Sequence, residues 1–514
     1  MPRARNARST ARSPRKRTRD GLEQLPYAPF QHGFAALQVI RNDQVEAIHR
    51  ASMTILETTG LRVLEPEARR LFKEAGFRVD EASQQVRFDR AGIADLVAKA
   101  PAKTSVRGRG EGRRLEIGGD TMVIATVGGP PFVSDLERGR RPGTSADMED
   151  FLKLTQSLNI IHIEGGCSVE PTDLPPETRH LDFYLAASRL TDKSWKPLSN
   201  GFSKARDAIE MGKILYGVDE EALAGDPVFF VNTNTNTPLV LDAEITQGII
   251  AFAEVGQPIC VTPFALSGAM APTTLAGALA LQNAETLAAC ALVQLVRPGC
   301  PYIYGSFTSN VDMRTGSPAF GTPEYALAAQ ASGQLARRYG LPWRSSNTTA
   351  SNAADAQAAY ESEMSIWGAV TGRASILNQG AGWLEGGLVA SYEKLILDAE
   401  MLQMMQVWSQ GFPVDEDSLG IDAIAEVGPG GHFFGSEHTL QRFETAFYAP
   451  LVSDWSNYEN WTDAGARDAA GRATLIWQKL LADFQPPPLD PGVDEALAAY
   501  VRLRKEAHHL SNAS

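Results

Sequence analysis

The sequence predicts an α/β fold, a TIM (β/α)8 barrel preceded by an N-terminal extension of helices and strands. From Thr121 onward, short apolar runs rich in β-branched residues alternate with longer helical patterns, and this alternation is typical of a parallel sheet. Seven or eight such units in roughly 300 residues favour a closed barrel over an open sheet. No Gly-x-Gly-x-x-Gly motif follows the first run, so the commonest sign of an open nucleotide-binding sheet is missing.

Seven candidate strands can be located by their apolar residues, and an eighth is expected after Gly411, near Phe433 or within residues 446–451. In a barrel, function gathers at the carboxyl ends of the strands. The residues that directly follow the apolar runs are therefore the candidate site. The seven runs are residues 159–164, 196–199, 228–231, 259–262, 302–304, 342–344 and 375–378.

Helix boundaries are explicit at several points of the sequence. Residues 322–324, Thr-Pro-Glu, place a cap, a proline and an acid at the start of a helix that should stop at Gly340. Thr144 and Asp147 have the spacing of a capping box. Residues 272–298 form a long Ala- and Leu-rich pattern. Local signals thus predict where these helices begin and end.

Four segments are expected along the chain. Residues 1–25 should be a disordered basic tail, and residues 26–120 an accessory region with helical patterns and short β-prone pieces. Residues 121–485 should form the barrel, and residues 486–514 a helical tail.

The composition is that of an ordinary globular protein, with 43% hydrophobic and 21% charged residues. The formal net charge is −13, although the first 19 residues hold eight Lys or Arg and no acid. An acidic body disfavours nucleic acid and anionic lipid as partners. We therefore expect a cytoplasmic protein with no nucleic-acid and no membrane partner, as a monomer or a homo-oligomer. The basic leader should be a solvated tail, with a transit peptide or a nucleic-acid-binding segment as alternatives.

The four cysteines lie far apart and include no Cys-x-x-Cys pair or zinc-type spacing. We expect free thiols in a reducing compartment and no metal site on this chain. The four are Cys167, Cys260, Cys290 and Cys300.

The predicted strand ends are rich in amides, hydroxyls and glycines and poor in acid–base groups. His162 lies inside an apolar run and is expected to be a core histidine. Glu164 either faces the barrel mouth as a base or pairs with a buried arginine. Between Lys213 and Lys394 there is no lysine, so strands three to seven cannot supply a Schiff base.

Aromatic residues gather near the same strand ends, where they could form a cage for a cation. Each ring face would contribute about 0.5 to 2 kcal/mol once water is excluded. Phe307 and Trp383 are the best candidates because each follows a glycine-containing loop, and packing in the core is the alternative. The other aromatic residues of this set are Phe264, Tyr304, Trp343 and Tyr360.

Long motifs carry a resemblance to a known family. Residues 382–388 read Gly-Trp-Leu-Glu-Gly-Gly-Leu, and residues 425–435 read Ala-Glu-Val-Gly-Pro-Gly-Gly-His-Phe-Phe-Gly. Together with residues 128–135, 271–285 and 304–324, these motifs resemble the trimethylamine methyltransferase-like family over nearly all of the chain after the leader.

The resemblance implies a TIM barrel that moves a methyl group from an amine to Co(I) of a separate corrinoid protein. The cobalamin would thus be carried by a partner, with no cofactor on this chain. Founding members of this methanogenesis-related family carry pyrrolysine after the sixth strand, which aligns near Asn352. No lysine occurs there, which argues against trimethylamine and for a quaternary amine, glycine betaine or a related betaine, whose nitrogen already carries a neutral leaving group.

Residue roles follow from this interpretation. The ammonium would contact Phe307 and Trp383 with Tyr304 beside them, and no covalent catalyst is expected. The remaining predicted site residues are Asn352, Asp355 and Glu385 for positioning, Asn232, Asn234, Asn347 and Arg344 for a carboxylate, and Gly430, Gly431, His432 and His438 facing the corrinoid.

Alternatives remain open at this point. The glycine-rich residues 428–435 can equally be a structural turn that caps a helix. The donor can be another methylated amine or a sulfonium compound, and a non-catalytic betaine-binding or scaffold protein would share the same cage.

Overall fold

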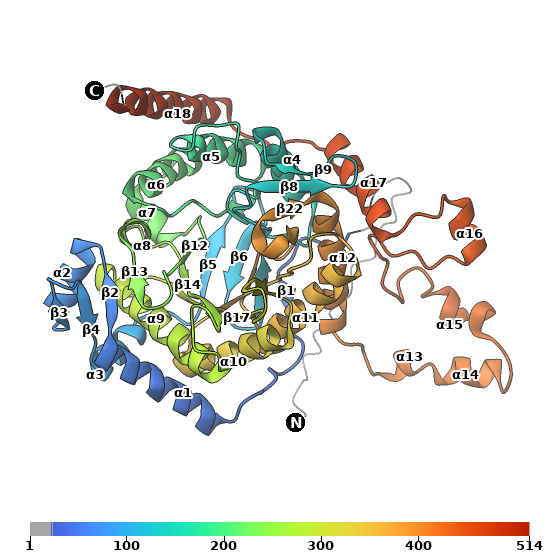
Figure 1. The fold of residues 1–514 in the computed structure, drawn as a ribbon. Coiled ribbons are helices and arrows are strands. Elements are labelled where there is room, and N and C mark those ends of the chain that lie inside the picture. Colours follow the sequence, from blue (N-terminus) through green and yellow to red (C-terminus); the bar gives the residue numbers. More distant parts are fainter. Residues whose placement is uncertain (1–21, 23, 513–514) are drawn as a thin grey trace, which may run out of the picture.

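A computed structural model describes residue 22 and residues 24–512 (Figure 1). Within this part of the chain, eight short strands run parallel, and the mixed α/β fold is confirmed. The eight are β7 (Thr121–Ile124), β10 (Ile163–Glu164), β11 (Ser194–Trp195), β12 (Val231–Asn234), β14 (Ile259–Thr262), β16 (Tyr302–Gly305), β19 (Trp343–Ser346) and β20 (Ile376–Asn378).

The strand pairing is nearly circular. One sheet has the order β1-β7-β20-β19-β16-β14-β12, with β1 (Phe30–Gln31) antiparallel at its edge. A second, parallel pair of β10 and β11 is joined to this sheet by a bridge between Ala125 and Ile163. No ladder of the described residues joins β11 to β12, where Ser194 Oγ donates to the carbonyl of Val228 at 2.7 Å instead. The paired strands therefore do not form a closed ring.

Helices surround these strands in Figure 1. Of the helices that the structure describes, α9 alone is long and apolar enough to cross a membrane, but 89% of its apolar window is buried inside the fold. It is therefore explained as a core helix. The surrounding helices are α4 (Ser145–Ser157), α5 (Arg179–Leu190), α6 (Phe202–Tyr216), α7 (Glu220–Gly225), α8 (Ala243–Glu254), α9 (Leu275–Val296), α10 (Pro323–Tyr339), α11 (Ala356–Gly372) and α12 (Tyr392–Ser409).

Most predicted boundaries agree with these elements. The run at 259–262 coincides with β14, and α10 begins after the Thr322 cap and ends at Gly340. Thr144 and Asp147 form the expected capping box of α4. The strand expected at 196–199 is wrong, because β11 ends at Trp195 and Pro197 has no N–H for a ladder.

The predicted eighth strand after Gly411 is also wrong. The missing strand is β7, which precedes the first predicted run, and residues 392–512 contain no strand. β7 has only four residues, and its pairing with β20 is decided by partners more than 250 positions away. A four-residue segment such as Thr-Met-Val-Ile does not indicate, from local sequence, a pairing partner so far away in the chain.

The N-terminal extension consists of short helices and a small sheet of order β13-β2-β4-β3. Its helices α1, α2 and α3 pack against α9. The predicted basic tail, residues 1–25, lies outside the described residues except for positions 22, 24 and 25. The elements are α1 (Asn42–Thr54), the π-helix η1 (Ile55–Thr59), β2 (Leu61–Val63), α2 (Pro66–Glu74), β3 (Arg78–Asp80), β4 (Gln85–Arg87), α3 (Arg90–Val97), β5 (Thr104–Arg107), β6 (Arg114–Ile117) and β13 (Val240–Leu241).

The hairpin of β5 and β6 covers the amino ends of the parallel strands. The backbone N–H of Arg107 donates to Pro227, which precedes β12, and that of Arg109 donates to Asp192, which precedes β11. The hairpin packs its apolar residues against side chains of five parallel strands and against Phe230, which directly precedes β12. This cluster is Val106, Leu115, Ile117, Val123, Ala125, Ile163, Phe230, Cys260, Ile303 and Ile376. The carboxyl ends are left for a site.

Two small sheets follow the carboxyl ends of the parallel strands. In the first, β15 pairs parallel with β17, and β18 lies antiparallel to β17. The second has the order β21-β22-β8-β9. Their bounds are β15 (Phe264–Ser267), β17 (Phe307–Val311), β18 (Pro318–Ala319), β21 (Trp383–Leu384), β22 (Val389–Ser391), β8 (Phe132–Asp135) and β9 (Gly139–Pro142), with the 3-10 turn η2 at Glu385–Gly387.

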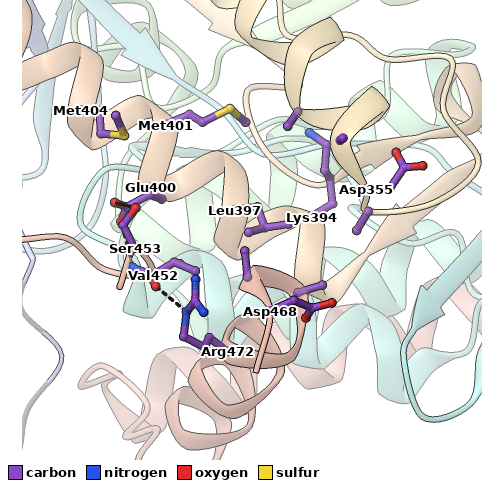
Figure 2. Close-up of a pocket in the computed structure, with 15 residues that line it drawn as sticks. Asp355, Lys394, Leu397, Glu400, Met401, Met404, Val452, Ser453, Asp468 and Arg472 are labelled. Atoms are coloured by element: carbon purple, nitrogen blue, oxygen red, sulfur yellow. Dashed lines mark hydrogen bonds between the residues drawn. The ribbon is translucent and has the colours of Figure 1, made fainter. Parts of the chain in front are cut away.

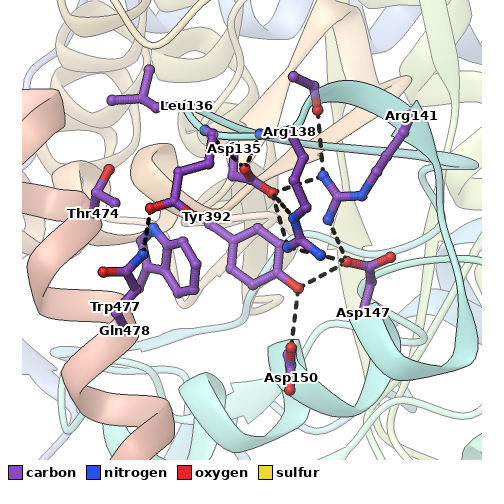
Figure 3. A network of polar contacts seen from close by, with 12 residues as sticks. Asp135, Leu136, Arg138, Arg141, Asp147, Asp150, Tyr392, Thr474, Trp477 and Gln478 are labelled. Atoms are coloured by element: carbon purple, nitrogen blue, oxygen red, sulfur yellow. Dashed lines mark hydrogen bonds and ion pairs between the residues drawn. The ribbon is translucent and has the colours of Figure 1, made fainter.

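A buried polar network fastens the second small sheet to the helices (Figure 3). The Arg141 guanidinium contacts Asp135 at 2.7 Å and Asp147 at 2.6 Å. The hydroxyl of Tyr392 donates to Asp147 at 3.0 Å, and Arg138 also contacts Asp135. Asp147 also belongs to the capping box of α4. The N-terminus of α4, the second small sheet and α12 are therefore joined by one network of ion pairs and hydrogen bonds.

The C-terminal region has two parts. Residues 411–457, which we call the arm, extend away from the ring of helices in Figure 1. Beyond the arm, α17 packs against α12 and α4, and α18 packs against α5 and α6. The elements are α13 (Glu416–Leu419), α14 (Ile421–Val427), the 3-10 turn η3 (Phe433–Gly435), α15 (Glu437–Leu440), α16 (Tyr458–Asp463), α17 (Ala469–Ala482) and α18 (Pro491–Asn512).

Candidate functional site

Buried polar atoms that lack a hydrogen-bond partner among the described residues gather at the carboxyl ends of β19 and β20. Each such atom costs roughly 1 to 3 kcal/mol if nothing else satisfies it. A cluster of them therefore indicates a place where a ligand or water supplies the missing partners. The atoms are Arg344 Nε, Ser346 Oγ, Asn347 Oδ1, Asn378 Nδ2 and Oδ1, Gln379 Oε1 and Trp383 Nε1. We call this region the mouth.

Four aromatic rings lie together at the mouth. The register of β15 and β17 sets Phe264 beside Phe307, with ring centroids 5.0 Å apart. Trp383, from the second small sheet, lies 6.2 Å from Phe307 with 27° between the ring planes. Phe320 contacts both, at 5.6 Å and 6.2 Å. The structure therefore brings together Phe307 and Trp383 as predicted, and adds Phe320, which sequence analysis missed although it lies within the 304–324 motif.

Trp383 is held by its own loop. The backbone N–H of Gly382 donates to Asp398 at 2.9 Å, and Asp398 forms a buried ion pair with Lys394. Lys394 also donates to Ser362 at 2.6 Å. A Cβ at Gly387 would lie 2.7 Å from the indole ring, so only glycine allows this close approach.

Arg344 lies beside the aromatic rings, as a buried cation. It is 2% exposed, and its Cζ is 5.7 Å from the centroid of the Phe307 ring. Its Nη1 donates to the carbonyl of Ser306 at 3.1 Å, whereas its Nε has no partner. Burial lowers the pKa of this guanidinium, but arginine stays charged in proteins. A positive group with a free donor thus adjoins an aromatic surface.

Glu164 and Lys196 are two buried charged residues near the ends of β10 and β11 that influence each other without forming an ion pair. Glu164 accepts hydrogen bonds from the N–H of Gly166 at 2.7 Å, and from the N–H and hydroxyl of Ser168 at 3.2 Å and 3.0 Å. It therefore does not pair with an arginine, contrary to one expectation. Burial raises the pKa of Glu164 to about 7 and lowers the pKa of Lys196 to about 8.

Sequence analysis missed Lys196 as a site residue. It considered lysines only on the third to seventh predicted runs, whereas Lys196 opens the second predicted run and directly follows β11. His162, by contrast, is the core histidine that was expected. Its Nε2 lies 2.8 Å from the carbonyl of Ala28, and its Nδ1 accepts from the N–H of Ile124. Burial lowers the pKa of His162 to about 3, so it stays neutral.

The asparagines divide into buried and open ones. Asn347 donates to Gly380 at 2.9 Å, and its Oδ1 has no partner. Asn378, which was not predicted, is fully buried with both amide atoms unpaired. Asn232 accepts from Thr262 at 3.2 Å and is half-buried, and Asn234 is exposed. Asn232 and Asn234 are two residues apart and therefore lie on the same side of β12. Phe230, just before the strand, is on this side and faces the interior.

Tyr304 is separated from the aromatic cluster. Its hydroxyl donates to Asn283 of α9 at 2.9 Å, and its ring stacks on Tyr339 of α10. Side chains alternate along a strand, so Ile303 points inward while Tyr304 faces the helices. Trp343 is also separated, because its Nε1 donates to Ser306 while its ring packs beside Gly333 and Gly372.

Two of the three predicted positioning residues, Asn352 and Asp355, lie in the loop before α11, and the third, Glu385, contacts this loop from η2. Asp355 is the N-cap of α11 and accepts from Ala358 at 3.0 Å. Glu385 contacts Arg140 through both carboxylate oxygens at 2.9 Å, and its N–H donates to Ser351 at 2.9 Å. Asn352 is exposed. Asp355 and Glu385 are thus engaged in contacts that shape the loop.

The predicted corrinoid-facing residues lie on the arm, away from the ring of helices in Figure 1. His432 lies beside Phe434, with ring centroids 6.1 Å apart, and His438 is in α15. Phe434 is 86% exposed. The turn at Gly428 and Gly430 has positive φ angles and ends α14, as the structural alternative expected.

A cavity of about 400 Å³ lies elsewhere, between α11, α12 and α17 (Figure 2). Its walls are largely apolar, with Leu397, Met401 and Val452 among them. The carboxylate of Glu400 already accepts from the backbone of Val452 and the hydroxyl of Ser453. Because its polar groups are satisfied, this cavity is explained by packing at the root of the arm. Among the described residues, no group of three His, Cys, Asp or Glu side chains could hold a metal ion.

Comparison with known proteins defines the class as methyltransferases. A family model described as trimethylamine methyltransferase (MTTB) matches residues 4–509. The chain is 37% identical over 468 residues to the glycine betaine methyltransferase of Desulfitobacterium hafniense strain Y51, covering 91% of this chain and 97% of the relative. It is 28% identical to the trimethylamine methyltransferase MttB of Desulfitobacterium hafniense strain DSM 10664 / DCB-2, covering 91% and 94%. The chain therefore belongs to the trimethylamine methyltransferase family, and the predicted resemblance is confirmed.

Proposed function

We propose that this chain removes a methyl group from a quaternary amine that carries a carboxylate, glycine betaine or a related betaine, and passes it to a separate corrinoid protein. One observation carries the proposal: in the mouth, aromatic ring faces lie beside the buried guanidinium of Arg344, whose Nε has no hydrogen-bond partner among the described residues. These are complementary to the two ends of a betaine. The family membership and the relative named glycine betaine methyltransferase support the same reaction.

The chemistry needs no acid or base from the protein. The methyl carbon–nitrogen bond breaks with its electron pair staying on nitrogen, which leaves as a neutral tertiary amine. The acceptor's electron pair forms the new bond to carbon, so no proton moves. A reduced corrinoid on the partner would supply that strongly nucleophilic acceptor. The residues of this chain then act by alignment and charge complementarity.

The pyrrolysine-equivalent loop supports a quaternary substrate. Residues 348–357 read Thr-Thr-Ala-Ser-Asn-Ala-Ala-Asp-Ala-Gln, without lysine. Glu361 fixes this loop by accepting hydrogen bonds from the N–H groups of Ala350 and Ser351. A fixed loop of this kind can form one wall of the substrate site. We keep Asn352, Asp355 and Glu385 in that positioning role.

Residue roles follow from the geometry. Phe307 and Trp383 hold the ammonium, backed by Phe264 and Phe320. Arg344 and Asn347 bind the carboxylate, while Asn232 and Asn234 line the open side. Gly430, Gly431, His432 and His438 contact the corrinoid protein from the arm, and the exposure of neighbouring Phe434 supports a partner there.

The barrel and the compartment belong to the same proposal. We infer that the eight parallel strands close as a TIM barrel, because β11-β10-β7 and β7-β20-β19-β16-β14-β12 together account for the order of such a ring.

A cytoplasmic location is supported by the four cysteines, which are buried and free.

The test supplies purified protein with reduced cobalamin and three donors: glycine betaine, trimethylamine and dimethylsulfoniopropionate. Mass spectrometry should detect dimethylglycine and no dimethylamine. Arg344→Ala should lower the rate with glycine betaine, whereas Arg338→Ala, which removes a surface pair with Glu46, should not. Product from the sulfonium donor alone, or from none of the three, would refute the proposal.

A further inference from the structure

Two buried cations of the mouth lack a carboxylate partner. Lys196 is 9% exposed and Arg344 is 2% exposed. Among the described residues, neither forms an ion pair within 4.0 Å, and Arg344 Nη1 donates to the carbonyl of Ser306 and to no carboxylate. Buried charges in proteins are normally paired or bind a ligand. These two cations therefore mark a place for an anion.

The single nearby carboxylate is already engaged. Glu164 accepts three hydrogen bonds from Gly166 and Ser168 of its own loop. It acts on Lys196 only at longer range, and Arg344 opposes it as a second positive charge. Among the described residues, the charged side chains that act most strongly on Lys196 are thus one carboxylate, which its own loop satisfies, and one further cation.

The two cations face the interior of the strands from different positions. Lys196 follows β11, and Arg344 lies on β19. Ser194 is paired with Ile163 and Arg344 with Ile376, and both isoleucines belong to the interior cluster. Because side chains alternate along a strand, Lys196, two residues after Ser194, and Arg344 both lie on the interior side. Arg344 in turn lies beside Phe307. Both cations therefore lie on the interior side, and Arg344 also adjoins the aromatic cluster.

We propose that Lys196 binds the substrate carboxylate together with Arg344 and thereby selects zwitterionic amines over simple quaternary cations. This inference rests on the proposed function and names a specificity residue within it. A guanidinium offers two parallel donors to a carboxylate, and an ammonium adds a point charge. A cation without a carboxylate would meet the same positive groups and be repelled.

The experiment compares two ligands that share the ammonium. Calorimetry measures the affinity of wild type, Lys196→Met and Lys213→Met for glycine betaine and for tetramethylammonium. Lys196→Met should weaken glycine betaine by about tenfold or more and leave tetramethylammonium unchanged or tighter. Lys213, whose ammonium pairs with Glu210 on α6, is the matched control and should change neither.

A ligand pair without any mutation guards against a misfolded variant. Glycine betaine amide keeps the ammonium and replaces the carboxylate by a neutral amide, so wild type should bind it about tenfold more weakly or worse. Equal loss of both ligands in Lys196→Met, or unchanged betaine affinity, would overturn the role of Lys196 while the proposed function stands. Wild type that binds neither ligand and forms no dimethylglycine would overturn both.

Discussion

The two motifs that carry the family resemblance have opposite structural settings. Residues 382–388 lie in the mouth, where Trp383 is 6% exposed and its loop is held by Asp398. Residues 425–435 lie on the arm, where Phe433 and Phe434 are exposed. Both motifs are rich in glycine and aromatic residues. A shared composition therefore does not tell which motif packs in the fold and which is presented outward.

The difference has a physical cause. The first motif lies between a small sheet and α12, so its glycines let backbone and indole approach closely. The second motif lies between short helices of four to seven residues that bury little against the ring. An exposed apolar segment of this kind is typical of an interaction surface. Four measurements test this contrast.

The largest effect is expected at the clamp of the first motif. Asp398→Ala removes the partner of buried Lys394 and the acceptor of the Gly382 N–H. Leaving a buried charge unpaired costs about 3 to 5 kcal/mol, which urea unfolding measures. Asp483→Ala removes an exposed ion pair of the same i,i+4 spacing at the C-terminal end of α17 and should leave the unfolding midpoint unchanged. Similar effects for the two variants would contradict the clamp.

The next effect is expected at the indole itself. Trp383→Ala should weaken glycine betaine binding by roughly 1 to 3 kcal/mol, since one face of the cation loses its aromatic contact. The fold should remain intact in circular dichroism. Calorimetric titration provides the value, and an unchanged affinity removes Trp383 from the site.

A pH effect should follow from the charges of the mouth. Burial lowers the pKa of Lys196 to about 8, so the ammonium that attracts a carboxylate is lost as pH rises through that value. Burial raises the pKa of Glu164 to about 7, so protonation below that value adds to the positive field. Arg344 stays charged, and burial keeps the thiols of Cys167 and Cys260 neutral.

The affinity for glycine betaine should therefore fall about tenfold between pH 7 and pH 9. Calorimetry in buffers of matched ionic strength measures it. Affinity that rises over the same range would contradict the charge assignment.

The smallest effect is expected on the arm. Phe434→Ser changes a side chain that is 86% exposed, so the free energy of unfolding should shift by less than about 0.5 kcal/mol. Phe151→Ala is the contrasting variant in the core, where the ring contacts Tyr392, and should cost about 3 to 5 kcal/mol. A large decrease in the free energy of unfolding of Phe434→Ser would mean that the arm packs against the rest of the fold.

Local signals predicted much of the fold. The cap at Thr322, the capping box at Thr144 and the apolar run of β14 were located by residue type and spacing alone. The capping bonds span three residues, and the strand signal spans four, so both are visible in a short window. The aromatic pair Phe307 and Trp383 was also predicted, because each follows a glycine-containing loop.

Other features depend on contacts between distant segments. Tyr304 faces the helices because Ile303 occupies the interior, and this phase is set by the register of β16 against β14. Lys196 lies on the interior side because Ser194, two residues earlier, is paired with interior Ile163 of β10. Neither fact leaves a local trace in the sequence.

By itself, the sequence determined the alternation of strands and helices, the absence of lysine from strands three to seven and the family. Only the tertiary structure decided that β7 is the eighth parallel strand and that Lys196 and Arg344 are both buried. Backbone preferences act over a few residues, whereas the direction of a side chain within a sheet is fixed by pairing partners that can lie hundreds of positions away.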